Sequence, residues 1–245
     1  MKFSEYINNP MGVKNAVFSM REMYRNVYRQ KLDNILAREL GKIEYTLYKD
    51  KDRYLFHFKI PSEVVYKFYY DVVVEFFSKD KTVLNEKNLN NYDIRFYSND
   101  PYFIYTFAYV FNKNNMFIKD LESKVSKYTL STKAMVRNPY NQVGYVKSIY
   151  FTYLIMNKYS LFDKDKIDME IKKYDKKELL SNVMEADKKI ELRKEKAPKK
   201  NKDKINHDKQ NKNENNTSKK SNIVNKTKTT NTVKRTNVVK TSKKK

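Results

Sequence analysis

The chain has 245 residues, of which 40% are hydrophobic and 33% charged, and its formal net charge is +23. This length suits one large domain or two small ones, and such an excess of cations favours polyanionic partners, nucleic acid before an anionic membrane surface. Cysteine is absent, which excludes disulfides and thiolate chemistry.

The aromatic residues separate a folded part from a tail. All 21 Tyr and 14 Phe residues lie at or before Tyr174, and from Pro198 onward 16 Lys and Arg residues stand against three acidic residues. A segment without apolar rings cannot offset its ordering entropy by burial. We therefore predict a compact domain over residues 1–175, a charged helical extension over 176–197, and a disordered Lys/Asn/Thr-rich tail over 198–245.

The periodicity of apolar residues predicts the first elements. Helical spacing indicates a long amphipathic helix over residues 15–40, and period-two alternation in residues 43–47 and 53–60 indicates a β-hairpin. Residues 64–77 carry three charged side chains at helical spacing, but their β-branched and aromatic content favours a strand. After a polar loop, residues 94–97 form a brief predicted strand.

A ring-rich helix within residues 95–113 follows that strand. Asp100 precedes Pro101, so Asp100 is the predicted N-cap and Pro101 the first helical residue. Rings recur at i, i+4 spacing on two stripes, formed by Phe103, Phe107 and Phe111 and by Tyr105 and Tyr109. We predict a buried helix that is apolar nearly all round, in preference to a platform on which bases stack.

The remaining folded residues complete the predicted fold class. We expect a short helix over residues 118–128, irregular structure over 131–142 and a helix over 145–159. Charged helical segments over 166–173 and 176–194 lead the chain out of the core. The fold class is therefore α+β, with a small antiparallel sheet of three or four strands packed by helices, including the buried aromatic-rich helix.

The sequence offers little basis for catalysis. Its three glycines, Gly12, Gly41 and Gly144, are isolated, whereas phosphate-binding loops and dinucleotide fingerprints need clustered glycines. His57 lies in a predicted strand and His207 in the predicted tail, so a zinc site would need mostly carboxylate ligands. We predict a non-enzymatic protein with no catalytic residues, metal site or cofactor.

One enzymatic alternative stays open, a metal-dependent nuclease. Glu122-Ser123-Lys124 matches the acidic-x-Lys element of such enzymes, and Asp100 lies upstream. The predicted helix around Glu122 and the capping role of Asp100 argue against it. In a chain rich in lysine and acidic residues, this short match also arises readily by chance.

Two groups of residues are candidates for nucleic-acid binding. A loop combines cations with rings that can stack on unpaired bases, namely Arg137, Tyr140, Tyr145 and Lys147. The tail carries cations that would neutralise phosphates without sequence preference and with steep salt dependence, namely Lys199, Lys200, Lys202, Lys204, Lys219, Lys220, Lys226, Lys228, Lys234, Arg235, Lys243, Lys244 and Lys245. The alternatives are loop rings packed in the core and a tail that only aids solubility.

Two stretches, FYSNDPYFIYTFAYVFNKN at residues 96–114 and RNPYNQVGYVKSIYF at 137–151, resemble proteins of tailed bacteriophages that infect low-GC bacteria. The resemblance covers roughly residues 1–180 and implies a virion component or an assembly or genome-handling protein, without assigning residue roles.

We therefore expect a phage protein, located in the host cytoplasm or the virion, that binds nucleic acid non-specifically through its tail and contacts other phage proteins or itself. The alternative is a virion structural or assembly protein that acts through protein contacts alone. The N-terminus has no signal-peptide pattern and no apolar run is long enough to span a membrane, so no transmembrane segment is expected.

Overall fold

The computed structural model describes residues 1–8, 18–38, 43–80, 82–84, 87–139, 141, 143–144, 146–167 and 170–196. The chain divides into a compact unit, Met1–Pro198, and a second unit, Lys199–Lys245. The second unit lies outside the described residues, and the prediction of a disordered tail therefore concerns residues that the structure does not describe.

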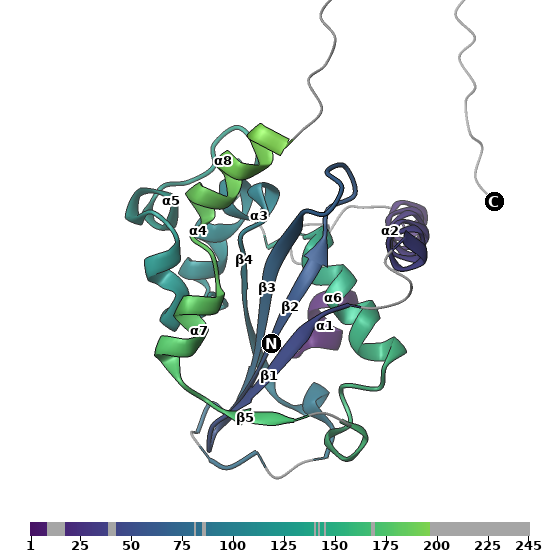
Figure 1. Cartoon of the computed structure of the whole chain (residues 1–245), viewed down its shortest axis with the longest axis vertical. Helices are drawn as coiled ribbons and strands as arrows, with labels where there is room; N and C mark the ends of the chain where they lie inside the picture. The colour runs from purple at the N-terminus through teal and green to yellow at the C-terminus, as the bar shows by residue number, and fades with distance from the viewer. Residues whose placement is uncertain are drawn as a thin grey trace, which may run out of the picture. The chain divides into compact units, whose positions relative to one another are not determined.

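One mixed sheet lies at the centre of the first unit, with the strand order β4-β3-β2-β1-β5 (Figure 1). Its strands are β1 (Tyr45–Lys49), β2 (Arg53–Pro61), β3 (Tyr69–Phe77), β4 (Asp93–Ser98) and β5 (Ile171–Lys173). The first four are antiparallel neighbours, which confirms the predicted hairpin, whereas β5 runs parallel to β1.

The α+β class is confirmed, but the sheet has five strands where three or four were expected. The extra strand, β5, lies in a segment predicted to be helical. All three residues of β5 are exposed. Because a fully exposed strand has no apolar alternation, its sequence carries no pattern typical of a strand.

Helices cover both faces of the sheet, with α1 and α6 on one side and α7 and α8 on the other (Figure 1). The α-helices are α1 (Phe3–Asn8), α2 (Phe18–Arg38), α3 (Pro101–Thr106), α4 (Ala108–Lys113), α5 (Lys127–Ser131), α6 (Lys147–Lys158), α7 (Lys176–Asn182) and α8 (Ala186–Lys196). Three short 3-10 helices are η1 (Leu89–Asn91), η2 (Lys119–Lys124) and η3 (Lys164–Lys166).

The helix predicted over residues 118–128 is replaced by η2 and α5. Ser126 separates the two, because its backbone is extended and its Oγ accepts a hydrogen bond from the Thr129 N–H as the N-cap of α5. The helix predicted over 145–159 is confirmed as α6, and the first predicted helix is confirmed as α2 within the described residues.

Apolar rings fill the space between the sheet and the α1 and α6 side. Successive residues of a strand direct their side chains to opposite faces, so Phe56, Phe76 and Phe96 of three adjacent strands share one face. The ring centroid of Phe3 in α1 lies 5.0 Å from that of Phe96, and the Tyr6 centroid lies 5.4 Å from it. Burial of these rings removes a large apolar area from water and so stabilises the fold.

The opposite face of the sheet contains a buried carboxylate with several polar partners. Asp71 of β3 is fully buried, with His57 Nε2 2.8 Å from its Oδ1 and the Lys59 ammonium paired to the same oxygen. The side-chain amide of Asn99 donates to Asp71 Oδ2 at 2.6 Å, and the Met184 N–H donates to it at 3.3 Å. The contact with Asp71 therefore gives His57 a structural role.

A second buried carboxylate, Glu75 of β3, lies on the same face. It pairs with Arg53 and Arg95 at 3.2 Å each, and Arg53 also contacts Asp120 at 2.8 Å. The Tyr174 hydroxyl donates to Asp120 at 2.8 Å, and the Arg53 guanidinium carbon lies 4.1 Å from the Tyr174 ring centre. These contacts attach the segment before α7 to the sheet.

The helices α7 and α8 therefore belong to the compact unit. Leu179, Val183, Ala186 and Ile190 are buried, and the first three join the main apolar core. The segment expected to carry the chain out of the core instead packs across the face that bears Asp71 and Glu75.

The ring-rich helix begins as predicted and then breaks. The Asp100 Oδ1 accepts a hydrogen bond from the Tyr102 N–H at 2.9 Å, and Pro101 is the first helical residue. At Phe107 the backbone leaves helical geometry, with φ −122° and ψ −20°, so α3 and α4 are separate helices.

The buried aromatic-rich helix is confirmed, because the three Phe residues of this helix pair are buried, but two of its tyrosines are exposed. Tyr102 is 47% exposed and Tyr105 is 43% exposed. Because α3 packs against the core along its Phe103 side, tyrosines displaced by one or two residues from that stripe face outward.

Asp71→Asn is expected to lower the free energy of unfolding by about 3–5 kcal/mol, because it leaves cationic and N–H donors on a buried site without a carboxylate. Burial alone raises the pKa of Asp71, but His57 and Lys59 outweigh burial and hold that pKa well below its ordinary value of 3.8. The stabilisation is therefore present above that value and is lost as the pH falls below it. Urea unfolding between pH 3 and 7 measures both effects.

The control for this substitution is Asp80→Asn, which removes an exposed carboxylate and should change stability by less than about 0.5 kcal/mol. Equal, small effects of the two substitutions would contradict the role given to Asp71.

Candidate functional site

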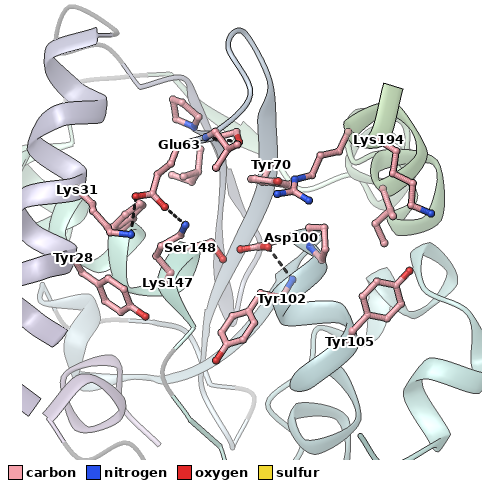
Figure 2. Close-up of a pocket in the computed structure, with 18 of the residues that line it drawn as sticks. Tyr28, Lys31, Glu63, Tyr70, Asp100, Tyr102, Tyr105, Lys147, Ser148 and Lys194 are labelled. Atoms are coloured by element: carbon pink, nitrogen blue, oxygen red, sulfur yellow. Dashed lines mark hydrogen bonds and ion pairs between the residues drawn. The ribbon is translucent and has the colours of Figure 1, made fainter. Parts of the chain in front are cut away.

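A cavity of about 580 Å³ opens where the β2–β3 connection meets α2, α3, α6 and α8. Five cations and two carboxylates line it together with several rings (Figure 2). The cations are Lys31, Arg137, Lys147, Arg193 and Lys194; the carboxylates are Glu63 and Asp100; the rings are Tyr28, Tyr70, Tyr102, Tyr105 and Phe151.

Two lysines share the Glu63 carboxylate on one side of the cavity. Lys147 at the start of α6 contacts one oxygen of Glu63, and the Nζ of Lys31 from α2 lies 3.2 Å from the other (Figure 2). Burial raises the pKa of Glu63, but the two lysines outweigh burial and lower it. This side of the cavity is therefore a compensated ion cluster with one positive charge in excess.

Asp100 lies between the two sides of the cavity, as Figure 2 shows. Its side chain accepts a hydrogen bond from the backbone of the helix that it caps. The residue is only 8% exposed and caps α3. Burial raises the pKa of Asp100, while the Tyr102 N–H, Lys147 and Arg193 act in the opposite direction. The Asp100 N–H donates to Ser98 Oγ at 3.1 Å, which fixes the turn from β4 into α3.

The side formed by α8 and Arg137 carries cations without carboxylate partners. Within the described residues, Arg137, Arg193 and Lys194 form no salt bridge. The Nε of Arg193 is buried and makes no hydrogen bond to a described atom. The guanidinium carbon of Arg137 lies 5.8 Å from the centre of the Tyr105 ring, a cation–π arrangement.

Tyr70 connects the two halves of the cavity. Burial and the neighbouring Asp100 carboxylate raise the pKa of Tyr70, whereas Arg193 lowers it. Tyr70 is neutral at ordinary pH, as any unperturbed tyrosine is, and its raised pKa extends the range over which its hydroxyl is a hydrogen-bond donor to higher pH.

The structure brings together two of the four predicted loop residues. Arg137 and Lys147 line the same cavity, although they are ten positions apart in the chain. Tyr140 and Tyr145 lie outside the described residues, as do the thirteen tail cations from Lys199 to Lys245.

Sequence reasoning missed the contributions of α2 and α8. Lys31, Arg193 and Lys194 lie in charged helices, where cations are normally solvated, and only the packing of α8 against the sheet brings two of them to the cavity. The exposure of Tyr105 could have been suspected, because it lies on a different helical stripe from the three buried Phe residues.

The residues of the nuclease alternative do not share a cavity. Asp100 lines the cavity described above, while Glu122 and Ser123 line another, near α5. Across the ranges that the structure describes, no group of three or more His, Asp or Glu side chains is placed to hold a metal ion.

Comparison with protein-family models, curated proteins and solved structures finds no match to this chain. Among the described helices, none is both long and apolar enough to cross a membrane.

Asp100→Asn should keep or increase stability at neutral pH, whereas Asp100→Ala should lose about 1 kcal/mol through the missing N-cap. Asn caps helices as well as Asp, and the raised pKa of Asp100 means that its ionised form lowers the stability of the folded state. Any advantage of the Asn variant should therefore vanish as the pH falls below the ordinary carboxyl value of 3.8. Thermal unfolding of the three proteins at neutral and acidic pH provides the comparison. Equal losses for Asn and Ala at neutral pH would argue that the charge itself is needed.

Proposed function

We propose that this chain is a non-enzymatic protein that binds nucleic acid without sequence preference, through its basic tail and the cationic cavity of its folded unit. The observation that carries the proposal is the convergence of Arg137 and Lys147 with Arg193 and Lys194 around one cavity. Cations with exposed tyrosine rings beside them are the combination that single-strand-binding proteins use for phosphates and bases.

The tail supports the same function through its composition. Its 16 cations against three acidic residues provide many possible phosphate contacts. Each phosphate neutralised by Lys or Arg releases a condensed counterion, and this release favours binding most strongly at low salt. A segment of this kind makes no base-specific contacts, so the resulting binding is independent of sequence.

A phage setting, with the protein in the virion or handling the genome in the host cytoplasm, is part of the proposal. Its support is the resemblance carried by residues 96–114 and 137–151. Both stretches contribute to the cavity, the first through Asp100, Tyr102 and Tyr105 and the second through Arg137 and Lys147.

A second candidate function is a virion structural or assembly protein that works through protein contacts alone. It is favoured by apolar side chains exposed around α5 and the segment that follows it. Tyr128 is 74% exposed, Met135 65% and Val136 95%. An exposed apolar group of this kind suits a contact with another protein or a second copy.

Removal of residues 198–245 should weaken binding to random-sequence DNA and RNA by at least about tenfold at low salt and flatten the dependence of affinity on salt, because most phosphate contacts disappear. Fluorescence anisotropy across a salt series, with circular dichroism to check that residues 1–197 stay folded, measures this change.

Equal affinities of the full and truncated chains would show that the tail is not the binding element. Absence of binding by the full chain at low salt would overturn the proposed function and leave the second candidate.

A further inference from the structure

We propose that the cavity between α3, α6 and α8 binds one nucleoside phosphate unit, with the phosphate at Arg193 and Lys194 and the base against Tyr105. This nucleoside phosphate unit is either an unpaired nucleotide of a single strand or a free nucleotide. In the first case the inference rests on the proposed function and adds to it a preference for single-stranded over double-stranded nucleic acid.

The size of the cavity favours a single unpaired unit. At about 580 Å³ it falls within the range of sites that enclose small ligands. A duplex keeps its bases stacked inside and cannot place one in such a space without unpairing it, whereas a single strand can turn a base outward without that cost. Duplex nucleic acid is therefore confined to contacts at the cavity mouth and with the tail.

The distribution of charge orients the phosphate. Lys31 and Lys147 are already paired with Glu63, so one of their two positive charges is compensated. Figure 2 places Lys194 on the side of the cavity away from Glu63. Together with Arg193 it forms a cationic side on which neither cation has a salt bridge to a described carboxylate, with the capping carboxylate Asp100 between this side and Glu63.

Arg193 also has an unused donor. Its Nε is buried and has no hydrogen-bond acceptor among the described atoms. Because that atom is buried, a phosphate in the cavity reaches it only if the Arg193 side chain shifts, and such a shift would give the unfavourable unpaired donor an anionic acceptor. Arginine suits phosphate because its planar donors match two phosphate oxygens at once.

Tyr105 provides the surface for the base. Its side chain is 43% exposed and lies on the same side of Figure 2 as Lys194. The Arg137 guanidinium, 5.8 Å from the Tyr105 ring centre, is close enough to contact a base stacked on that ring. Stacking on tyrosine accepts any base, which agrees with binding that has no sequence preference.

The test compares the affinity of the full-length protein for an oligothymidylate of about 12 nucleotides with its affinity for a duplex that has the same number of phosphates. The double substitution Arg193→Gln/Lys194→Gln removes the phosphate contacts, and Tyr105→Ala removes the stacking surface. Lys113→Gln/Lys158→Gln is the matched charge control, since both lysines are exposed and neither lines the cavity. Tyr159→Ala, which removes an exposed tyrosine that lines neither this cavity nor the neighbouring hollow at Tyr105, is the control for the ring.

We expect tighter binding of the single strand than of the duplex. Arg193→Gln/Lys194→Gln and Tyr105→Ala should each weaken single-strand binding about tenfold while changing duplex binding no more than their controls do. Titration with thymidine 5′-monophosphate separates the two sources. Saturable binding of the monophosphate that is lost in Arg193→Gln/Lys194→Gln identifies a free nucleotide as a ligand. If the monophosphate does not bind, while the cavity variants selectively lose binding of the single strand, the ligand is a nucleotide of the strand.

The inference is wrong if the cavity variants match their controls on the single strand and the monophosphate does not bind in a cavity-dependent way. The proposed function survives that result as long as the full chain still binds polynucleotide in a salt-dependent manner. Conversely, cavity-dependent binding of the monophosphate without any polynucleotide binding would overturn the proposed function and keep the inference.

Discussion

The buried Asp71 carboxylate is the interaction on which the arrangement of this protein depends. From strand β3 it contacts Lys59 of β2, Asn99 at the end of β4 and the Met184 N–H between α7 and α8. An ionised carboxylate that is buried is stable only if its oxygens accept enough hydrogen bonds. Any displacement of the C-terminal segment would remove the hydrogen bond that the Met184 N–H donates to Asp71. Asp71 thereby fixes where α8 begins and, through α8, where Arg193 and Lys194 lie.

The two faces of the sheet have different physical roles. The face under α1 and α6 is filled with rings, and apolar packing alone tolerates alternative arrangements. The opposite face carries Asp71 and Glu75, whose charged hydrogen bonds have directional requirements that a single arrangement meets. We infer that the apolar face favours folding, while the charged face selects the position of the C-terminal helices.

Local sequence patterns predicted the elements whose geometry is decided locally. The β1–β2 hairpin, the Asp100 cap and α6 all follow from alternation, capping chemistry or helical spacing. The features that were missed depend on distant partners. The strand β5 is ordered by its pairing with β1. The helix α8 was predicted, but its packing against the sheet was not, because it depends on Asp71, more than 100 residues earlier in the chain.

The candidate site was likewise predictable only where the sequence pattern is local. Arg137 and Lys147 could be predicted because they interleave with rings in one short segment. Arg193 and Lys194 could not be predicted, since a run of charged residues in a helix normally indicates a solvated surface. Tyr105 was assigned to the core because the whole helix is apolar in composition, although its stripe faces the cavity.

The presence of a nucleotide in this cavity is tested most directly by photo-cross-linking. Full-length protein would be irradiated with a single strand that contains 4-thiothymidine, and the attached peptides identified by mass spectrometry. Cross-links to the α3 peptide that bears Tyr102 and Tyr105, reduced by Arg193→Gln/Lys194→Gln, are the expected result. Cross-links confined to residues 199–245 would contradict the account, because they would assign all contact with the strand to the tail.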